Sequence, residues 1–199
     1  MKKNLITAML MTIVTTVLLG IIYPLVVTAM AQLLFPDKAN GQLITHNGKL
    51  VGSRITGQPF TSDIYFHSRP SYAGSGYDGA NSSASNLGPT NHVLIERVNA
   101  SVAQLRSENP QKPVPIDLLT SSGSGLDPHI TPAAAEFQTP RVAKARGMSE
   151  EQLRAVIGRH TEGRQLGFLG EPRVSVLELI LDLDKQSPGK KALSRFRVR

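Results

Sequence analysis

The chain has 199 residues and no cysteine, which leaves room for one ordinary domain and a further segment and excludes a disulfide-stapled fold. Its formal net charge of +7 comes from the two ends, with Lys2 and Lys3 at the start and five basic residues after residue 189. The part between them carries as many acidic as basic residues. Because that part is neutral, the composition argues against a nucleic-acid partner.

The first predicted element is a membrane-spanning helix. No charged side chain lies between Lys3 and Asp37, and most residues between them are apolar. A helix needs about 20 apolar residues to cross the hydrocarbon core of a bilayer, and this stretch is longer. We therefore predict a cytoplasmic N-terminus over residues 1–6 and a transmembrane helix over residues 7–35, followed by one extracytoplasmic α+β domain over residues 36–187.

The same stretch has a second interpretation, as a secretory signal removed near Ala29-Met30-Ala31. Its apolar part exceeds the roughly 7–15 residues of a typical signal, which favours a retained anchor. Lys2 and Lys3 precede the span and no basic cluster follows it, so the positive-inside rule predicts a cytoplasmic N-terminus. The basic tail over residues 188–199 is predicted to be disordered, with contact to anionic lipid headgroups as the alternative.

One face of the predicted span indicates a docking surface for another helix. Small residues and a proline recur there at every fourth position, at Thr12, Thr16, Gly20, Pro24 and Thr28. This spacing lets a second helix approach closely, and threonine hydroxyls can bond across the contact. Pro24 has no N–H for the carbonyl of Gly20, which predicts a kink. In the alternative interpretation, the threonines bond only to the backbone of their own helix.

Turn and capping signals divide the rest of the chain into short elements. Residues 174–184 are ambiguous, because their length favours a helix while two valines near the start are typical of a strand; we favour the helix. The other predicted elements are a hairpin over 43–53, a long loop over 57–85, a helix from Thr90 or Asn91 to Asn109, a short strand over 114–120, a helix from Thr131 to Gly147 interrupted near Pro140, and a helix from Ser149 to about His160.

The stretch TSSGSGLDPHIT (120–131) contains the residue types of a nucleophilic triad, Ser124, Asp127 and His129. No G-x-S-x-G elbow surrounds the serine, and the glycines lack the spacing of a phosphate-binding loop. His129, His160, Glu162 and Asp127 show no metal-binding signature, so no metal site is predicted. Structural roles suffice, with Asp127 closing an Asx turn and Thr131 capping a helix.

The stretch HTEGRQLGFLGEPRV (160–174) combines three glycines with four charged residues that can pair: Glu162, Arg164, Glu171 and Arg173. A buried charge network and a contact with a partner both fit this composition. The sequence alone leaves the two open.

Four motifs in the same order carry a resemblance to a known family: SNLGPTN (85–91), SGSGLDPHIT (122–131), RVAKARG (141–147) and HTEGRQLGFLGEPRV (160–174). Together with the single span, they resemble the C subunit of the bacterial Kdp high-affinity potassium-transporting ATPase over about residues 1–184. The resemblance marks several residues of these loops as partner contacts or scaffold: Asn86, Thr90, Asn91, Ser124, Asp127, His129, His160, Glu162, Arg164, Glu171 and Arg173.

The resemblance implies a non-catalytic accessory subunit of the bacterial cytoplasmic (inner) membrane. Its partners would be a channel-like potassium-translocating subunit, a P-type ATPase subunit, a small single-span subunit and the lipid bilayer. It would act as a catalytic chaperone that raises the affinity of the ATPase subunit for ATP. No cofactor is assigned to the chain itself; ATP would be met through the ATPase subunit, and potassium is the transported ion.

Two other functions stay open at this point. One is a membrane-anchored extracytoplasmic hydrolase that uses Ser124, His129 and His160, which requires the three side chains to lie within reach of each other. The other is a lid that gathers potassium over the channel subunit. The part of the chain between the two basic ends has no net charge, so it would provide little electrostatic attraction for potassium ions. The chain has no Asp-Lys-Thr-Gly phosphorylation motif and no P-loop, so ATP hydrolysis belongs to another subunit.

Overall fold

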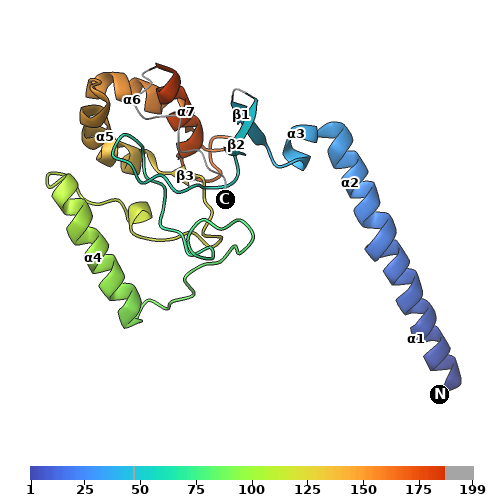
Figure 1. The fold of residues 1–199 in the computed structure, drawn as a ribbon. Helices are drawn as coiled ribbons and strands as arrows, with labels where there is room; N and C mark the ends of the chain where they lie inside the picture. Colours follow the sequence, from blue (N-terminus) through green and yellow to red (C-terminus); the bar gives the residue numbers. More distant parts are fainter. Residues whose placement is uncertain (47, 187–199) are drawn as a thin grey trace. The chain divides into compact units, whose positions relative to one another are not determined.

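The computed structural model describes residues 1–46 and 48–186, and the chain divides into two compact units, one over Met1–Leu43 and one from Ile44 onward. The predicted basic tail over 188–199 and Asn47 of the predicted hairpin lie outside the described residues. The combination of one long apolar helix with a helix-and-sheet domain confirms the predicted α+β class (Figure 1).

The N-terminal unit is a run of helix from Lys2 to Leu34, the one described segment that is long and apolar enough to cross a membrane. It consists of α1 (Lys2–Thr15), a π-helical segment (Thr16–Ile22) and α2 (Tyr23–Leu34), and a short helix α3 (Pro36–Ala39) follows. The π-helical segment ends directly before the turn that contains Pro24. Because Pro24 cannot donate to the carbonyl of Gly20, the regular hydrogen-bond pattern is interrupted here and the helix takes the wider π form. The predicted kink stays a prediction.

The second unit contains two small antiparallel sheets and four longer helices. A hairpin of β1 (Leu43–His46) and β2 (Lys49–Ser53) forms over the predicted range 43–53, and a second sheet has the order β3-β5-β4. The elements after the hairpin are α4 (His92–Glu108), a 3-10 helix η2 (Ile116–Leu118), β3 (His129–Ile130), α5 (Pro132–Arg146), α6 (Glu150–Arg159), β4 (Thr161–Glu162), β5 (Arg173–Ser175) and α7 (Val176–Gln186). Residues 54–91 contain no described helix or strand, as predicted for most of this segment.

The core lies where α5, α6 and α7 pack on the three-stranded sheet. Its largest fully buried apolar side chains come from the long loop, α5, α6, β5 and α7, and Phe66 is the one from the long loop. The others include Leu153 of α6 and Leu179, Ile180 and Leu183 of α7. Burial of each such side chain contributes about 1.5–3 kcal/mol, so this cluster is the main source of the domain's stability.

Capping residues end the helices as the sequence predicts. Asn91, rather than Thr90, caps α4, because its Oδ1 accepts a hydrogen bond from Val93 N at 2.9 Å. Ser149, at the predicted start of α6, forms a capping box with Gln152. Gly147, with a φ of 66°, ends α5 in the left-handed conformation that favours glycine.

Three expectations need correction or refinement. The strand predicted over 114–120 is wrong, because Pro113 and Pro115 cannot donate to a neighbouring strand and the segment forms η2 instead. The predicted interruption of α5 near Pro140 is also wrong: Phe137 and Val142 are both buried, which holds the two halves of the helix on one core. For residues 174–184, where the sequence was ambiguous between a helix and a strand, the structure has a short strand that ends at Ser175 and then a helix.

The strand β5 is the centre of its sheet. Val174 pairs with Ile130 of β3 on one side and with Thr161 of β4 on the other, both antiparallel. Val174 is fully buried, and the chain enters α7 two residues later. The β-branched Val174 is therefore part of a strand, and the apolar residues that follow it at helical spacing form the buried face of α7.

Candidate functional site

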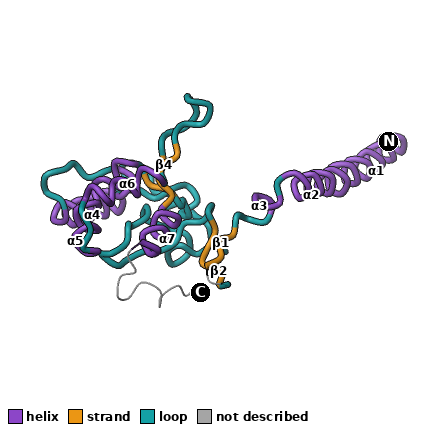
Figure 2. Tube along the Cα trace, turned by 90° about the horizontal axis from the view of Figure 1, so that it is seen from above, coloured by secondary structure: helices purple, strands orange, loops and turns teal. Residues whose placement is uncertain are grey.

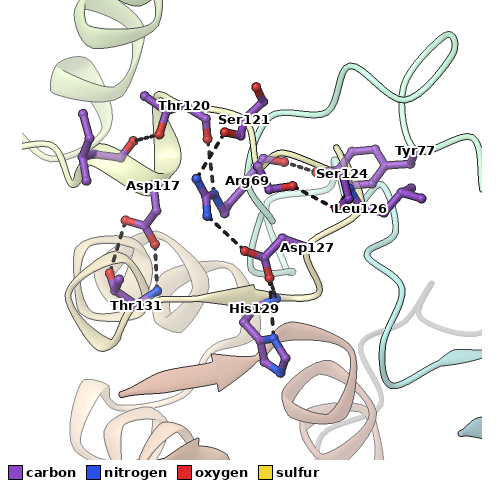
Figure 3. Close-up of polar contacts among 12 residues, drawn as sticks. Arg69, Tyr77, Asp117, Thr120, Ser121, Ser124, Leu126, Asp127, His129 and Thr131 are labelled. Carbon is purple, nitrogen blue, oxygen red and sulfur yellow. Dashed lines mark hydrogen bonds and ion pairs between the residues drawn. The ribbon is translucent and has the colours of Figure 1, made fainter. Parts of the chain in front are cut away.

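The corner formed by residues 120–131 is organised around Asp127. Its Oδ1 accepts a hydrogen bond from His129 N at 3.0 Å, which is the predicted Asx turn, and its Oδ2 accepts one from Arg69 Nη1 at 3.0 Å. Partial burial opposes ionisation, but the hydrogen bonds from His129 and Arg69 outweigh it and lower the pKa of Asp127. Figure 3 shows Asp127 between Arg69 and His129.

Arg69 ties the long loop to this corner. In addition to Asp127, its guanidinium donates to the carbonyls of Thr120 and Ser121, each at 3.3 Å. The residue was not among the predicted site residues, because nothing in the sequence indicates which carboxylate lies opposite it. Its separation from Asp127 by 58 positions makes the contact a product of the fold.

A second carboxylate, Asp117, supports the start of α5. Thr131 caps the helix as predicted, with Oγ1 accepting from Ala134 N at 3.1 Å. Asp117 is only 6% exposed and accepts from both Thr131 N, at 2.7 Å, and Thr131 Oγ1, at 3.2 Å. Sequence analysis missed Asp117, because a strand was expected over its segment.

The glycine at position 125 lets the corner approach the long loop closely. Gly125 has a φ of 68°, and a Cβ built there would lie 2.5 Å from the carbonyl oxygen of Ser83 and 2.8 Å from the nitrogen of Ala73. Next to it, the carbonyl of Ser124 accepts hydrogen bonds from Ser83 N at 3.0 Å and from Ser82 Oγ at 2.9 Å. No other residue fits at this position without moving the backbone.

The three candidate hydrolase residues do not form a catalytic group. Ser124 Oγ accepts from Leu126 N at 3.1 Å and lies 3.3 Å from Ser122 Oγ. The ring of His129 lies 3.5 Å from its own turn partner Asp127, whereas that of His160 is bonded to Asp182 in α7. Among residues 1–46 and 48–186, no hydrogen bond joins the serine to either histidine, and the hydrolase alternative has no nucleophile–base pair.

The described residues also contain no group of three or more His, Cys, Asp or Glu side chains placed to hold a metal ion. Near His160, the carboxylate of Asp182 accepts several hydrogen bonds, and these have a structural role. Asp182 is partly desolvated, but hydrogen bonds from Gln186, His160 and Arg159 lower its pKa to about 2. The bonds from Arg159 and His160 link the end of α6 to α7.

The residues of the 160–174 stretch pair as expected, but on the surface. Arg173 donates two bonds to Glu162 Oε2 at 2.9 and 2.7 Å, and Arg164 donates to both oxygens of Glu171 at 2.9 and 2.8 Å. The side chains are 42–75% exposed. A buried charge network is therefore wrong, and the interpretation as a partner contact remains.

The remaining predicted site residues belong to the 85–91 motif and to the docking face of the N-terminal helix. Asn86 is exposed, with a φ of 52°, and Thr90 is exposed directly before α4. In the helix, Thr12 Oγ1 donates to the carbonyl of Ala8 at 2.9 Å, as in the alternative interpretation of its face. Around Gly20, a Cβ would meet only the methyl group of Thr16, at 3.9 Å, so this face stays open to another helix.

The described structure thus combines one helix able to span a membrane with a small α+β domain whose polar clusters hold the domain's own loops and helices together. These features are consistent with the class of membrane-anchored proteins that carry one apolar N-terminal helix and an attached α+β domain.

Comparisons with known proteins give the family. The family model KdpC, the K⁺-transporting ATPase c chain, matches residues 5–185, and the chain belongs to this family. It is 65% identical to the potassium-transporting ATPase KdpC subunit of Koribacter versatilis over 188 residues, which cover 94% of this chain and 97% of the relative. The subunits of the same name from Acidobacterium capsulatum and Rhodopseudomonas palustris are 52% and 50% identical, each covering 92% of this chain and 98% of the relative. The chain is therefore a non-catalytic subunit of the Kdp ATPase.

Proposed function

We propose that this chain helps to assemble an ATP-driven high-affinity potassium pump and, as a catalytic chaperone, raises the ATP affinity of its P-type ATPase subunit. The observation that carries the proposal is the family match over residues 5–185. The carboxylates of Asp127, Asp117 and Asp182 are compatible with it, because each is hydrogen-bonded to other residues of the described domain. The proposed partners are the channel-like, P-type ATPase and small single-span subunits of the same complex.

The proposed topology places the N-terminus in the cytoplasm and the domain outside the membrane. Lys2 and Lys3 in front of the apolar helix support this orientation. ATP binds to the ATPase subunit on the cytoplasmic side, so the domain would not contact the nucleotide. Coupling then has to pass through the assembly: a chain that binds one conformation of the complex more tightly increases the population of that conformation and its affinity for ATP.

The central test is the ATP affinity of the complex in lipid, measured with and without this chain. A coupling free energy typical of such effects changes affinity about 5–150-fold. Equal affinities in the two preparations would exclude the chaperone role. Protease treatment of intact spheroplasts tests the topology in the same cells: a C-terminal epitope should be digested from outside, and a protected epitope would reverse the orientation.

A second test concerns the docking face at Thr12, Thr16, Gly20, Pro24 and Thr28. In Gly20→Leu, the larger side chain would occupy the open surface beside Thr16 and keep another helix at a distance. We expect this variant to insert into the membrane and to lose partner subunits on detergent extraction. Val14→Leu enlarges an exposed residue on another face and should retain them. Equal co-purification of both variants would remove the docking face from the proposal.

A further inference from the structure

The loop that joins β4 to β5 is the most exposed apolar feature of the second unit. Figure 2 shows it extending from the rest of the domain beyond β4. All residues from Glu162 to Glu171 are exposed. Its end presents three apolar side chains, Leu166 at 83%, Phe168 at 69% and Leu169 at 48% exposure, which we call the tip. Single exposed apolar residues are common, but three together on a projecting loop indicate an interaction site.

The tip has a defined backbone structure. Gln165 and Leu169 exchange two backbone hydrogen bonds, each of 2.9 Å, and Gly167 N donates to the carbonyl of Arg164 at 3.2 Å. Leu166 has a φ of 53°, a left-handed conformation that a leucine rarely adopts. The backbone of the loop is therefore held in one arrangement before any partner is bound, which reduces the backbone entropy lost on binding.

The charges at the base of the tip identify the kind of partner. Arg164 is paired with Glu171, and Arg173 with Glu162, so the loop has no net charge from these four residues. A segment that binds anionic lipid presents unpaired basic residues, and one that rests in the membrane interface commonly presents Trp or Tyr. The tip region has neither feature. Apolar side chains surrounded by satisfied polar groups are typical of a protein–protein interface.

We propose that the tip inserts into an apolar pocket on another protein subunit of the same ATPase, with Phe168 as the central anchor. This inference rests on the proposed function and makes it more specific, because it assigns one contact surface to the domain in addition to the membrane helix. Phe168 has the largest side chain of the tip, and an aromatic side chain buries about 150–250 Å² when fully covered. The paired charges at the base would form the polar rim of the contact.

The test is co-purification of the full-length chain with the other subunits of the complex from detergent. Truncation of a residue that dominates an interface weakens binding by a factor of about 30 or more. We expect such a loss for Phe168→Ala and a larger one for Phe168→Asp. Ile116→Ala is the matched control, because Ile116 is 68% exposed on η2, outside the tip. Thermal unfolding of each full-length variant should match that of the original chain, since Phe168 lies outside the core.

The outcomes separate this inference from the proposed function. If the unaltered chain fails to co-purify with the other subunits, the proposed function fails. If it co-purifies and Phe168→Asp does so to the same extent, the tip is not a contact and only this inference is overturned. Loss with Ile116→Ala to the same degree would also overturn it, because the effect would not be specific to the tip.

Insertion into lipid is tested directly, because the chain contains no tryptophan. In Phe168→Trp, a single tryptophan reports the surroundings of the tip in phosphatidylcholine vesicles that contain only this chain. We expect the emission of a solvent-exposed indole and no quenching by brominated lipid. Quenching in the absence of the other subunits would show that lipid covers the tip and would overturn the proposed protein pocket.

Discussion

The ion pair between Arg146 of α5 and Asp184 of α7 provides a strong test of how this domain is held together. Their side chains are 1% and 5% exposed, and Arg146 Nη2 lies 2.8 Å from Asp184 Oδ1. Arg146 Nε also donates to the carbonyl of Ile64 at 2.6 Å, and the guanidinium lies 5.4 Å from the ring centre of Tyr65. The pair therefore joins two helices and the long loop.

The substitution Asp184→Asn keeps the shape of the side chain and removes its charge. The guanidinium then remains buried beside a neutral amide, and removal of one partner from a buried pair costs about 3–5 kcal/mol. Because a domain of this size loses about 2–4 °C in Tm per kcal/mol, we expect Tm to fall by about 6–20 °C. The measurement is thermal unfolding of the full-length chain in detergent, followed by circular dichroism.

Two variants complete the test. Arg146→Met together with Asp184→Leu replaces both charges by apolar groups, and this double variant should be more stable than Asp184→Asn. Glu150→Gln breaks an exposed pair with Arg154, in which both side chains are 44% exposed, and should cost less than about 1 kcal/mol. A cost for Asp184→Asn as small as that of Glu150→Gln would refute the reasoning from burial.

Three further predictions concern the polar clusters, each measured as unfolding of the full-length chain in urea. Gly125→Ala should cost more than about 1 kcal/mol because of its positive φ and blocked Cβ position, whereas Gly123→Ala, whose Cβ meets nothing within 4 Å, should cost less; equal effects would contradict this. Asp117→Ala should cost about 1–3 kcal/mol, because it removes the acceptor of two hydrogen bonds from Thr131, and an unchanged stability would assign the capping to Thr131 alone. The pKa of Asp182 is lowered from 3.8 to about 2, so its contribution, about 1 kcal/mol after allowance for solvent screening, should be nearly complete above about pH 4 and be lost as the pH falls through about 2. Asp182→Asn should remove that part of the pH dependence, and an identical pH profile would exclude this role.

Local signals allowed much of the fold to be predicted from the sequence. The caps at Asn91, Thr131 and Ser149 depend on contacts within three residues, and the apolar length of the first helix needs no tertiary information. The Asx turn at Asp127 belongs to the same group. In each case the residue type and its immediate neighbours determine the structure.

Features that depend on distant contacts were missed or predicted wrongly. Asp117 faces Thr131 and Arg69 faces Asp127 only because the chain folds back, and no spacing in the sequence indicates either pair. The strands β3 to β5 have two or three residues each, too few for an alternating pattern to be recognised. The continuity of α5 through Pro140 likewise depends on core packing, which outweighs the local tendency of proline to break a helix.

The long segment between β2 and α4 determines how part of the domain can unfold locally. It forms no helix or strand of its own, and its order comes from attachments such as Arg69, Phe66 and the backbone of Ser83. Chain entropy opposes its order at every residue, so the attachments must act together. Detachment at the 120–131 corner would release much of the segment as one cooperative unit. Native-state hydrogen exchange should then show amides from both regions becoming accessible with the same free energy, below that of global unfolding.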